Sequence, residues 1–480
     1  LLDFKEGVSF ARFAGGKRDP SWLPHVKLVG VNVNDDREFG LALLRYLRDE
    51  LRRRAEAAKR HEATKLEELR GVDAQGRWPR IMAVIDEFQV LLDGRDEVAA
   101  EAVSLLEDLA RRGRSQGIHL VLASQDVAGI EALWGRPSLI AQFTLRIALP
   151  KARRLLADAN SLADEIPRFH AVVNADSGVA EANRVVRLPN ASDRKIWDPL
   201  QEKLWRSRPA DNDSPLLFDG DHVPTLPEAP METTADTVST TDAVPTAVLG
   251  KSIDVSSRAA VLRLTRAPGR NLAVLGTRTV EACDVLASAA LSVARKHDVG
   301  VTICCLDPDA AAGAYRLAGS LDAAGATVDW RDSLGDVVED WTDLPSDRPQ
   351  LLLLYAVDAA GSALGAPGRE KLRDMLLTGP ERRVHTVGWW RSVPRLREDL
   401  GGFAARFDAV DAWVALDVQG PELAPLSPLP GGPSWYPRLR RGLFFDRAVH
   451  RQPEVLIPYD TDSILPTVDN ILTGSRVDEC

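Results

Sequence analysis

The chain has 480 residues, 45% of them hydrophobic, with 60 Lys and Arg against 70 Asp and Glu and only four cysteines. The hydrophobic content excludes global disorder, and four cysteines in so long a chain do not make a disulfide framework, which favours a reducing compartment. The net charge of −10 argues against a generally basic nucleic-acid-binding surface but leaves room for a local basic channel. The length predicts about three domains or two large ones.

Membrane and export signals are not visible in the sequence. No apolar run approaches the roughly 18 residues that a membrane span needs, and no signal peptide is visible. The chain opens on the apolar segment Leu1-Leu2-Asp3-Phe4, which has the pattern of a strand. Because a domain rarely begins within a strand, we expect the first domain to be truncated and its beginning to lie upstream.

The first half alternates between strand and helix patterns. Strands are predicted at 28–35, 81–86, 117–125 and 143–149, and helices from Asp36 to about Leu69 and at 96–112. The first of these helices carries many arginines, for which a solvated face is the favoured interpretation and a DNA-facing or subunit-facing helix the alternative. The alternation indicates an α/β fold with a parallel sheet.

The second half repeats this pattern after a segment of different composition. Residues 207–248 are rich in Pro, Thr and Asp and are predicted to be a linker. Strands follow at 271–276, 301–306, 349–357 and 384–389, with helices at 280–297 and 367–378. We therefore expect a domain at 1–206, a linker at 207–248, a related domain at 249–460 and a tail at 461–480.

The sharpest chemical signal is the apolar segment 81–85 followed by Asp86 and Glu87. This is the Walker B arrangement of nucleoside triphosphatases, in which Asp86 would hold Mg²⁺ through water and Glu87 would polarise the attacking water. A buried strand with two acids at its solvent end has the same pattern. Gln125 ends the next predicted strand, where a polar side chain senses the γ-phosphate in related triphosphatases; a solvent-exposed strand end is the alternative.

Several segments together resemble the FtsK/SpoIIIE family. Residues 78–92, which include the Asp-Glu pair, and residues 111–125, which read Arg-Arg-Gly-Arg-Ser-Gln-Gly-Ile-His-Leu-Val-Leu-Ala-Ser-Gln, are similar to consecutive motifs of that family. Residues 2–7 resemble the strand after its Walker A helix, and 145–149 resemble a later strand. The segments keep the family's order across residues 1–190.

The resemblance implies two RecA-like P-loop NTPase modules that use ATP and Mg²⁺. It also implies a bacterial, cytoplasmic ring, a homo-hexamer, that moves double-stranded DNA and has no membrane span in this chain. An upstream region could still provide membrane association. Rings of this family complete each site with an arginine from the neighbouring subunit, for which Arg114 and Arg146 are the candidates by position. The type VII secretion ATPases share these motifs but act on proteins.

The Walker A motif G-x-x-x-x-G-K-[ST] is absent. Gly250-Lys251-Ser252 lacks the first glycine, and Gly15-Gly16-Lys17-Arg18 also departs from the pattern. In the second half, Gly276 stands where the first glycine belongs, but Glu281, Ala282 and Cys283 replace Gly, Lys and Ser/Thr. Tyr355-Ala356 replaces the Asp-Glu pair there, so the second module is expected to be degenerate.

Our principal prediction is thus an FtsK/SpoIIIE-type ATPase that moves DNA, with Asp86, Glu87 and Gln125 in its site. The alternatives are a protein-translocating secretion ATPase and a non-catalytic scaffold that binds partners. His119 and His385 lie in predicted strands and are expected at the edge of the core.

Overall fold

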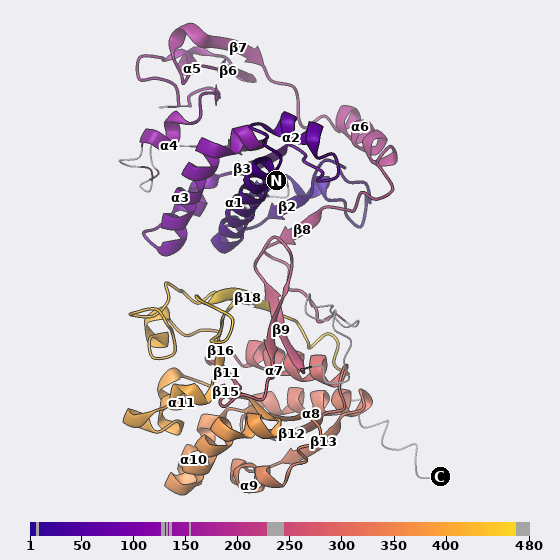
Figure 1. The fold of residues 1–480 in the computed structure, drawn as a ribbon, viewed down its shortest axis with the longest axis vertical. Coiled ribbons are helices and arrows are strands. Elements are labelled where there is room, and N and C mark those ends of the chain that lie inside the picture. Colours follow the sequence, from indigo (N-terminus) through magenta and orange to yellow (C-terminus); the bar gives the residue numbers. More distant parts are fainter. Residues whose placement is uncertain are drawn as a thin grey trace. The chain divides into compact units, whose positions relative to one another are not determined.

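The computed structural model describes residues 1–5, 9–125, 130, 133, 137–152, 155–227 and 244–466. The chain divides into two compact units, Leu1–His222 and Val223–Cys480, and each is described here by itself (Figure 1). No helix among the described residues has both the length and the apolar character that a membrane crossing requires.

The first unit contains a five-stranded parallel sheet in the order β4-β3-β1-β2-β8. Its strands are β1 (Leu2–Asp3), β2 (Leu28–Val31), β3 (Ile81–Asp86), β4 (Ile118–Leu122) and β8 (Leu216–Asp219). Its helices are α1 (Arg37–Arg60), α2 (Leu66–Val72), α3 (Glu97–Arg112), α4 (Pro137–Ala141), α5 (Leu162–Glu165) and α6 (Arg194–Arg206). The helix predicted from Asp36 to Leu69 is therefore interrupted between α1 and α2.

One face of this sheet is covered and the other is open. Helices α1 and α3 lie side by side on the covered face (Figure 1), joined by the Arg45–Glu101 ion pair, and Leu2 and Ile85 are fully buried there. On the opposite face Met82 is 66% exposed and Val121 is 43% exposed. Apolar side chains in the middle of a parallel sheet are normally covered on both faces, so this open face is unusual.

A small antiparallel sheet forms a separate part of the first unit. Its strands are β5 (Arg146–Ala148), β6 (His170–Asn174) and β7 (Asn183–Arg187), in the order β5-β6-β7. The strand predicted at 143–149 thus pairs in an antiparallel sheet and is not part of the parallel one. Its core is a small group of apolar residues that includes Ala148, Leu156 and Val172.

The second unit is built on a ten-stranded sheet in the order β10-β9-β18-β17-β16-β11-β15-β14-β12-β13. The parallel strands are β11 (Leu272–Leu275), β12 (Gly300–Cys305), β13 (Thr327–Arg331), β14 (Gln350–Tyr355), β15 (Val384–Trp390) and β16 (Ala412–Ala415). The antiparallel extension is β9 (Thr246–Ser252), β10 (Ala259–Arg263), β17 (Gly442–Asp446) and β18 (Glu454–Pro458).

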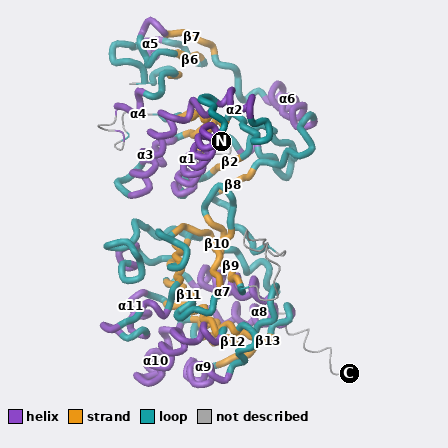
Figure 2. The backbone as a smooth tube through the Cα atoms, viewed as in Figure 1, coloured by secondary structure: helices purple, strands orange, loops and turns teal. Residues whose placement is uncertain are grey.

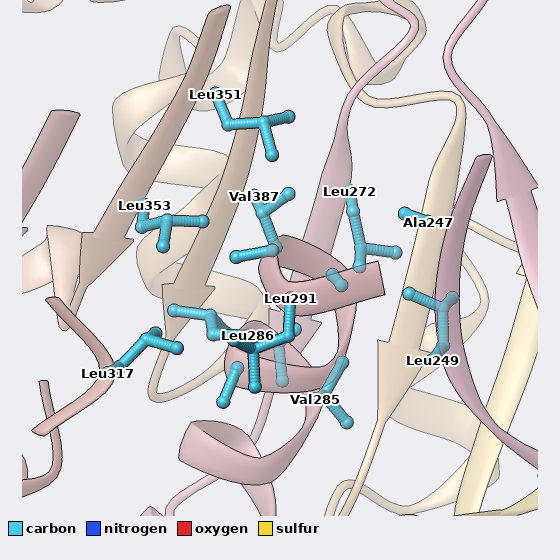
Figure 3. Packing of buried hydrophobic residues seen from close by; sticks show 14 of the residues in the cluster. Ala247, Leu249, Leu272, Val285, Leu286, Leu291, Leu317, Leu351, Leu353 and Val387 are labelled. Carbon is cyan, nitrogen blue, oxygen red and sulfur yellow. The ribbon is translucent and has the colours of Figure 1, made fainter. Parts of the chain in front are cut away.

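The helices of the second unit include one that is almost completely buried. The helices are α7 (Thr279–Ala294), α8 (Pro308–Ala323), α9 (Leu334–Asp340), α10 (Gly361–Thr378) and α11 (Val393–Asp399), seen with the strands in Figure 2. Helix α7 packs on β14 and β15 through apolar side chains such as Leu286 and Leu291, next to Leu353 and Val387 (Figure 3). This cluster is the main core of the unit.

The two units share a common arrangement of four strands. The order β4-β3-β1-β2 corresponds to β15-β14-β12-β13, and Asp3 pairs with Asp86 in the first unit as Cys305 pairs with Tyr355 in the second. In the second unit β11 lies beside β15 and α7 covers the sheet face that is open in the first unit. The described residues of the first unit contain no counterpart of β11 and α7.

The segment predicted as a linker, 207–248, has ordered strands at both ends. Strand β8 pairs with β2 in the first unit, and β9 begins at Thr246 in the second. Within the predicted tail, Thr461 is buried and donates hydrogen bonds to Asp284. Residues 228–243 and 467–480 lie outside the described residues.

Candidate nucleotide site

Asp86 and Glu87 lie at the carboxyl end of β3, as predicted. Asp86 is half-buried, and its Oδ1 accepts a hydrogen bond of 3.0 Å from the backbone N–H of Glu87. Glu87 is only 8% exposed and has a left-handed backbone conformation, φ 51° and ψ 41°. Such a conformation is costly for a residue other than glycine and concentrates at functional sites. The bend comes directly after Asp86, and the two adjacent carboxylates lie at the same strand end.

Gln125 joins these acids from the neighbouring strand. Strands β3 and β4 are parallel, with Ile85 opposite Leu122, so their carboxyl ends meet at one edge. The Nε2 of Gln125 donates a hydrogen bond of 2.6 Å to Oε1 of Glu87. The structure therefore brings together the three residues that the sequence assigned to the site. In open α/β sheets this edge is where ligands bind.

Asp3 and Lys5 also reach this site, although the sequence pattern gave them no role. Asp3 is 4% exposed and lies directly opposite Asp86 in the sheet. Burial raises the pKa of the Asp3 carboxyl, and the nearby Asp86 and Glu87 raise it further, while a hydrogen bond from the backbone N–H of Lys5 opposes them. The Nζ of Lys5 lies 4.0 Å from Oε1 of Glu87. The alternating pattern of residues 1–5 predicts that Asp3 lies in a strand. It does not predict that this strand pairs with β3.

Gln89 is a further member that the sequence did not reveal. It lies in the 3₁₀ helix Phe88–Leu92, one turn after the strand end. Its Nε2 donates a hydrogen bond to Oε2 of Glu87. Both carboxylate oxygens of Glu87 are thus held by side-chain amides.

The two arginines proposed to act on a neighbouring subunit lie away from this cluster. Arg114 is exposed in the 3₁₀ helix Gly113–Gln116, before the amino end of β4, whereas Gln125 follows its carboxyl end. Arg146 lies in β5 and donates hydrogen bonds to the carbonyls of Phe143 and Leu155. Burial lowers the pKa of Arg146.

The protein ligands at the site fit a magnesium ion held mainly by phosphates and water. Among the described residues no group of three or more His, Cys, Asp and Glu side chains is placed to hold a metal ion by itself. Mg²⁺ in triphosphatase sites uses one or two carboxylates together with phosphate oxygens and water. Asp86, fixed by the amide of Glu87, can provide such a carboxylate.

The position of a phosphate-binding loop in the second unit is filled by the side chain of Asp417. Gly276 has φ 129°, and a Cβ there would lie 2.0 Å from Oδ1 of Asp417. This carboxylate accepts a hydrogen bond of 2.7 Å from the backbone N–H of Thr277 and another from its hydroxyl. In a phosphate-binding loop such backbone N–H groups face the phosphates. Here the carboxylate of Asp417 accepts one of them, the N–H of Thr277.

Residues from the C-terminal part of the second unit contact the first turns of α7. Arg440 binds Asp284 through Nη1 at 2.9 Å, and its backbone N–H lies 3.4 Å from Oε1 of Glu281. Thr461 donates two hydrogen bonds to Asp284, of 2.9 and 2.7 Å. Burial raises the pKa of Asp284, with hydrogen bonds from Thr461 opposing it.

The Walker B position of the second unit has the same backbone conformation as that of the first, but it lacks the two carboxylates. Ala356 follows β14 with φ 51° and ψ 52°, close to the conformation of Glu87. Tyr355 is fully buried in the position of Asp86. The second unit is therefore a degenerate copy in both motifs.

Comparison with curated proteins finds relatives among secretion ATPases. No protein-family model matches the chain. It is 26% identical over 176 residues to the ESX secretion system protein EccC of Geobacillus thermodenitrificans, a match that covers 35% of this chain and 11% of that protein. It is 26% identical over 140 residues to YukB of Bacillus subtilis and 30% identical over 140 residues to EssC of Staphylococcus aureus, in each case covering 28% of this chain and 9% of the relative. The matched regions thus span about a tenth of these relatives.

Solved structures of the same group share the fold. The cytoplasmic domain of the type VII secretion ATPase EccC from Thermomonospora curvata superposes with a TM-score of 0.57 at 18% identity, over 99% of this chain and 58% of that one. ATPases 2 and 3 of EssC from G. thermodenitrificans give 0.54 at 14% identity, over 95% and 84%. ATPases 2 and 3 of the T. curvata EccC, in complex with a signal sequence peptide, give 0.55 at 14% identity, over 95% and 81%. The chain therefore has the fold of tandem P-loop ATPase modules.

Proposed function

We propose that the chain is part of a type VII secretion-like ATPase in which ATP hydrolysis by the first unit drives movement of a protein substrate. The observation that carries this proposal is the convergence of Asp86, Glu87 and Gln125 at one sheet edge. The sequence relatives, which are proteins of ESX and type VII secretion systems, support the choice of substrate.

Each residue has a defined task in the proposed reaction. Asp86 would hold Mg²⁺, which would neutralise charge on the phosphates, and Gln125 would contact the γ-phosphate. Glu87 accepts a proton from the attacking water, whose oxygen bonds to the γ-phosphorus as the bond to the β–γ bridging oxygen breaks, giving ADP and phosphate. ATP and Mg²⁺ are accordingly the proposed cofactors.

We also propose that a strand, a phosphate-binding loop and a helix cover the open face of the first unit in the working protein. The supporting comparison is internal: Met82 and Val121 are exposed, whereas Leu351 and Val387, at the same register positions of the second unit, are buried beneath α7. A segment like β11 and α7 would place a Walker A loop next to Asp86 and Glu87.

The distribution of charge supports a protein substrate. The first unit carries 34 Lys and Arg against 35 Asp and Glu, and the second carries 26 against 35. Several arginines of α1 make internal contacts: Arg45 pairs with Glu101, and Arg53 and Arg54 pair with Glu50. The helix that could have faced DNA therefore uses its positive charges within the unit, although a DNA-lined pore in an assembled ring remains the competing hypothesis for the test below.

A ring assembly with an arginine supplied by the neighbouring subunit is part of the proposal. Of the two candidates, Arg114 fits better because it is exposed, whereas the guanidinium of Arg146 is engaged by two carbonyls of its own unit. A cytoplasmic position next to a membrane secretion complex follows from the same proposal.

The first prediction concerns Glu87. In the full-length natural protein, Glu87→Gln should lower the ATP turnover number by at least about 100-fold, because the amide cannot accept the proton from water. The measurement is steady-state phosphate release. Glu56→Gln, the same change at an exposed position of α1, is the matched control and should leave turnover unchanged. Undiminished turnover in Glu87→Gln would exclude the role of Glu87.

The substrate class is tested with the same assay. A signal sequence peptide, the kind of ligand bound in the T. curvata EccC complex, should stimulate ATP turnover in the wild-type protein, and duplex DNA should not. Stimulation by duplex DNA alone would favour the DNA translocase. Absence of ATP turnover under every condition would favour the scaffold.

A further inference from the structure

The side chain of Glu87 is held from both sides by amides that come from different elements. Gln125, after β4, donates to Oε1 at 2.6 Å, and Gln89, in the 3₁₀ helix after β3, donates to Oε2. Glu87 is buried, so each of these bonds replaces one that water would otherwise make. The carboxylate is therefore fixed in the absence of nucleotide.

In the second unit the residues at the positions of Gln89 and Gln125 have no carboxylate between them, because Ala356 replaces Glu87. Asp358 follows Ala356 by two residues, as Gln89 follows Glu87, and Arg391 follows β15 at the register position that Gln125 has after β4. Arg391 binds Asp358 directly, with 3.1 Å from its backbone N–H and 3.0 Å from Nε. The Asp358 side chain is 4% exposed. The two flanking positions thus converge on one point in both units, and in the first unit Glu87 occupies that point.

The carbonyl of Gln89 has an unused hydrogen-bonding capacity. Its Oε1 is buried and accepts no hydrogen bond from any of the described residues. A buried acceptor without a donor costs free energy, and a water molecule next to Glu87 would supply the donor. The Gln89 amide therefore binds the Glu87 carboxylate through its N–H group and leaves its carbonyl oxygen without a donor.

We infer that Gln89 is a positioning residue for Glu87 in ATP hydrolysis. In the nucleotide-free site Gln89 and Gln125 both hold the carboxylate. When Gln125 turns to the γ-phosphate, Oε1 of Glu87 is released toward the attacking water while Gln89 keeps Oε2 in place. This inference rests on the proposed ATPase function of the first unit and adds a residue and a sequence of contacts to it.

Kinetics of Gln89→Leu in the full-length natural protein test the inference. The turnover number should fall about tenfold while KM for ATP and the unfolding temperature stay at the wild-type values, because Gln89 touches Glu87 and not the nucleotide. Gln75→Leu makes the same substitution at an exposed position and should leave all three quantities unchanged. Gln125→Leu should instead raise KM, because Gln125 contacts the phosphate.

An unchanged turnover number in Gln89→Leu overturns the inference, and so does a rise in KM without a fall in turnover. A crystal structure of the same variant provides a readout that does not require turnover. Glu87 should lose its single side-chain position, and an unchanged Glu87 overturns the inference. If the wild-type protein does not hydrolyse ATP at all, the proposed function fails, whereas this structural measurement still decides whether Gln89 positions Glu87.

Discussion

At the scale of single residues, burial decides which groups depart from their solution behaviour. His385 was expected at the edge of the core but is 1% exposed, and its Nδ1–H donates a hydrogen bond of 3.0 Å to the carbonyl of Arg270. Burial lowers the pKa of His385 to about 4, against an ordinary value of 6.5. The residue is therefore neutral in the folded second unit at every pH near neutrality.

A pH dependence of stability follows from His385. A folded pKa below the unfolded value gives a contribution that is complete above about pH 6.5 and is lost as the pH falls toward 4, because the unfolded state binds the proton first. The loss should reach about 3 kcal/mol. The measurement is urea unfolding from pH 7 to pH 4 in the wild-type protein and in His385→Gln.

The buried Asp399 and the half-buried Asp411 have carboxyl pKa values raised by burial and act in the opposite direction, so the comparison of the two proteins isolates the histidine. Parallel stability curves for wild type and variant would show that His385 does not titrate in this way.

At the scale of elements, α7 lies where the sequence pattern places a Walker A helix, but the residues around its start make internal contacts. Asp417 accepts the N–H of Thr277 at the start of the helix, and no lysine is present at its first turn. We expect ATP to leave the stability of the second unit unchanged. Asp417→Ala should lower stability by about 1 kcal/mol, through loss of hydrogen bonds at a partly exposed site, without creating ATP binding. Calorimetric titration with ATP and chemical unfolding measure the two effects.

Asp322→Ala, at an exposed aspartate of α8, is the control for removal of a negative charge. A gain of ATP affinity in Asp417→Ala would show that Asp417 competes with nucleotide and that the missing lysine is dispensable.

The open sheet face of the first unit can be compared with the matching face of the second unit, which α7 covers. Met82→Lys should change the stability of the 480-residue chain by less than about 0.5 kcal/mol, because the side chain is exposed. Leu351→Lys, at the matching position beneath α7, should cost more than about 4 kcal/mol, because it buries a charge in the core. Chemical unfolding of both variants measures this.

The same pair tests the proposed cover of the first unit. In the full-length natural protein Met82→Lys should become destabilising by several kcal/mol if a helix lies over that face. Equal tolerance in both forms would mean that the face stays open.

At the scale of the whole molecule, apolar patterning predicted the two α/β halves, because buried parallel strands such as 81–86 and 350–355 are nearly all apolar. It also predicted that Asp86, Glu87 and Gln125 would meet, since the carboxyl ends of adjacent parallel strands share an edge. It did not predict Asp3, because strand order determines that β1 lies beside β3. It did not predict Gln89, because its contact depends on the left-handed bend at Glu87. The pattern also did not predict that Arg146 lies in an antiparallel sheet, because it does not determine which strands pair.

The bend at the strand end has a consequence for engineering the second unit. Ala356 has the left-handed backbone of Glu87, at a cost of about 1 kcal/mol or more for a residue other than glycine. A catalytic group does not account for this conformation, since Ala356 carries none. The surrounding fold therefore imposes the bend, and a carboxylate introduced at position 356 would meet a backbone like that of Glu87.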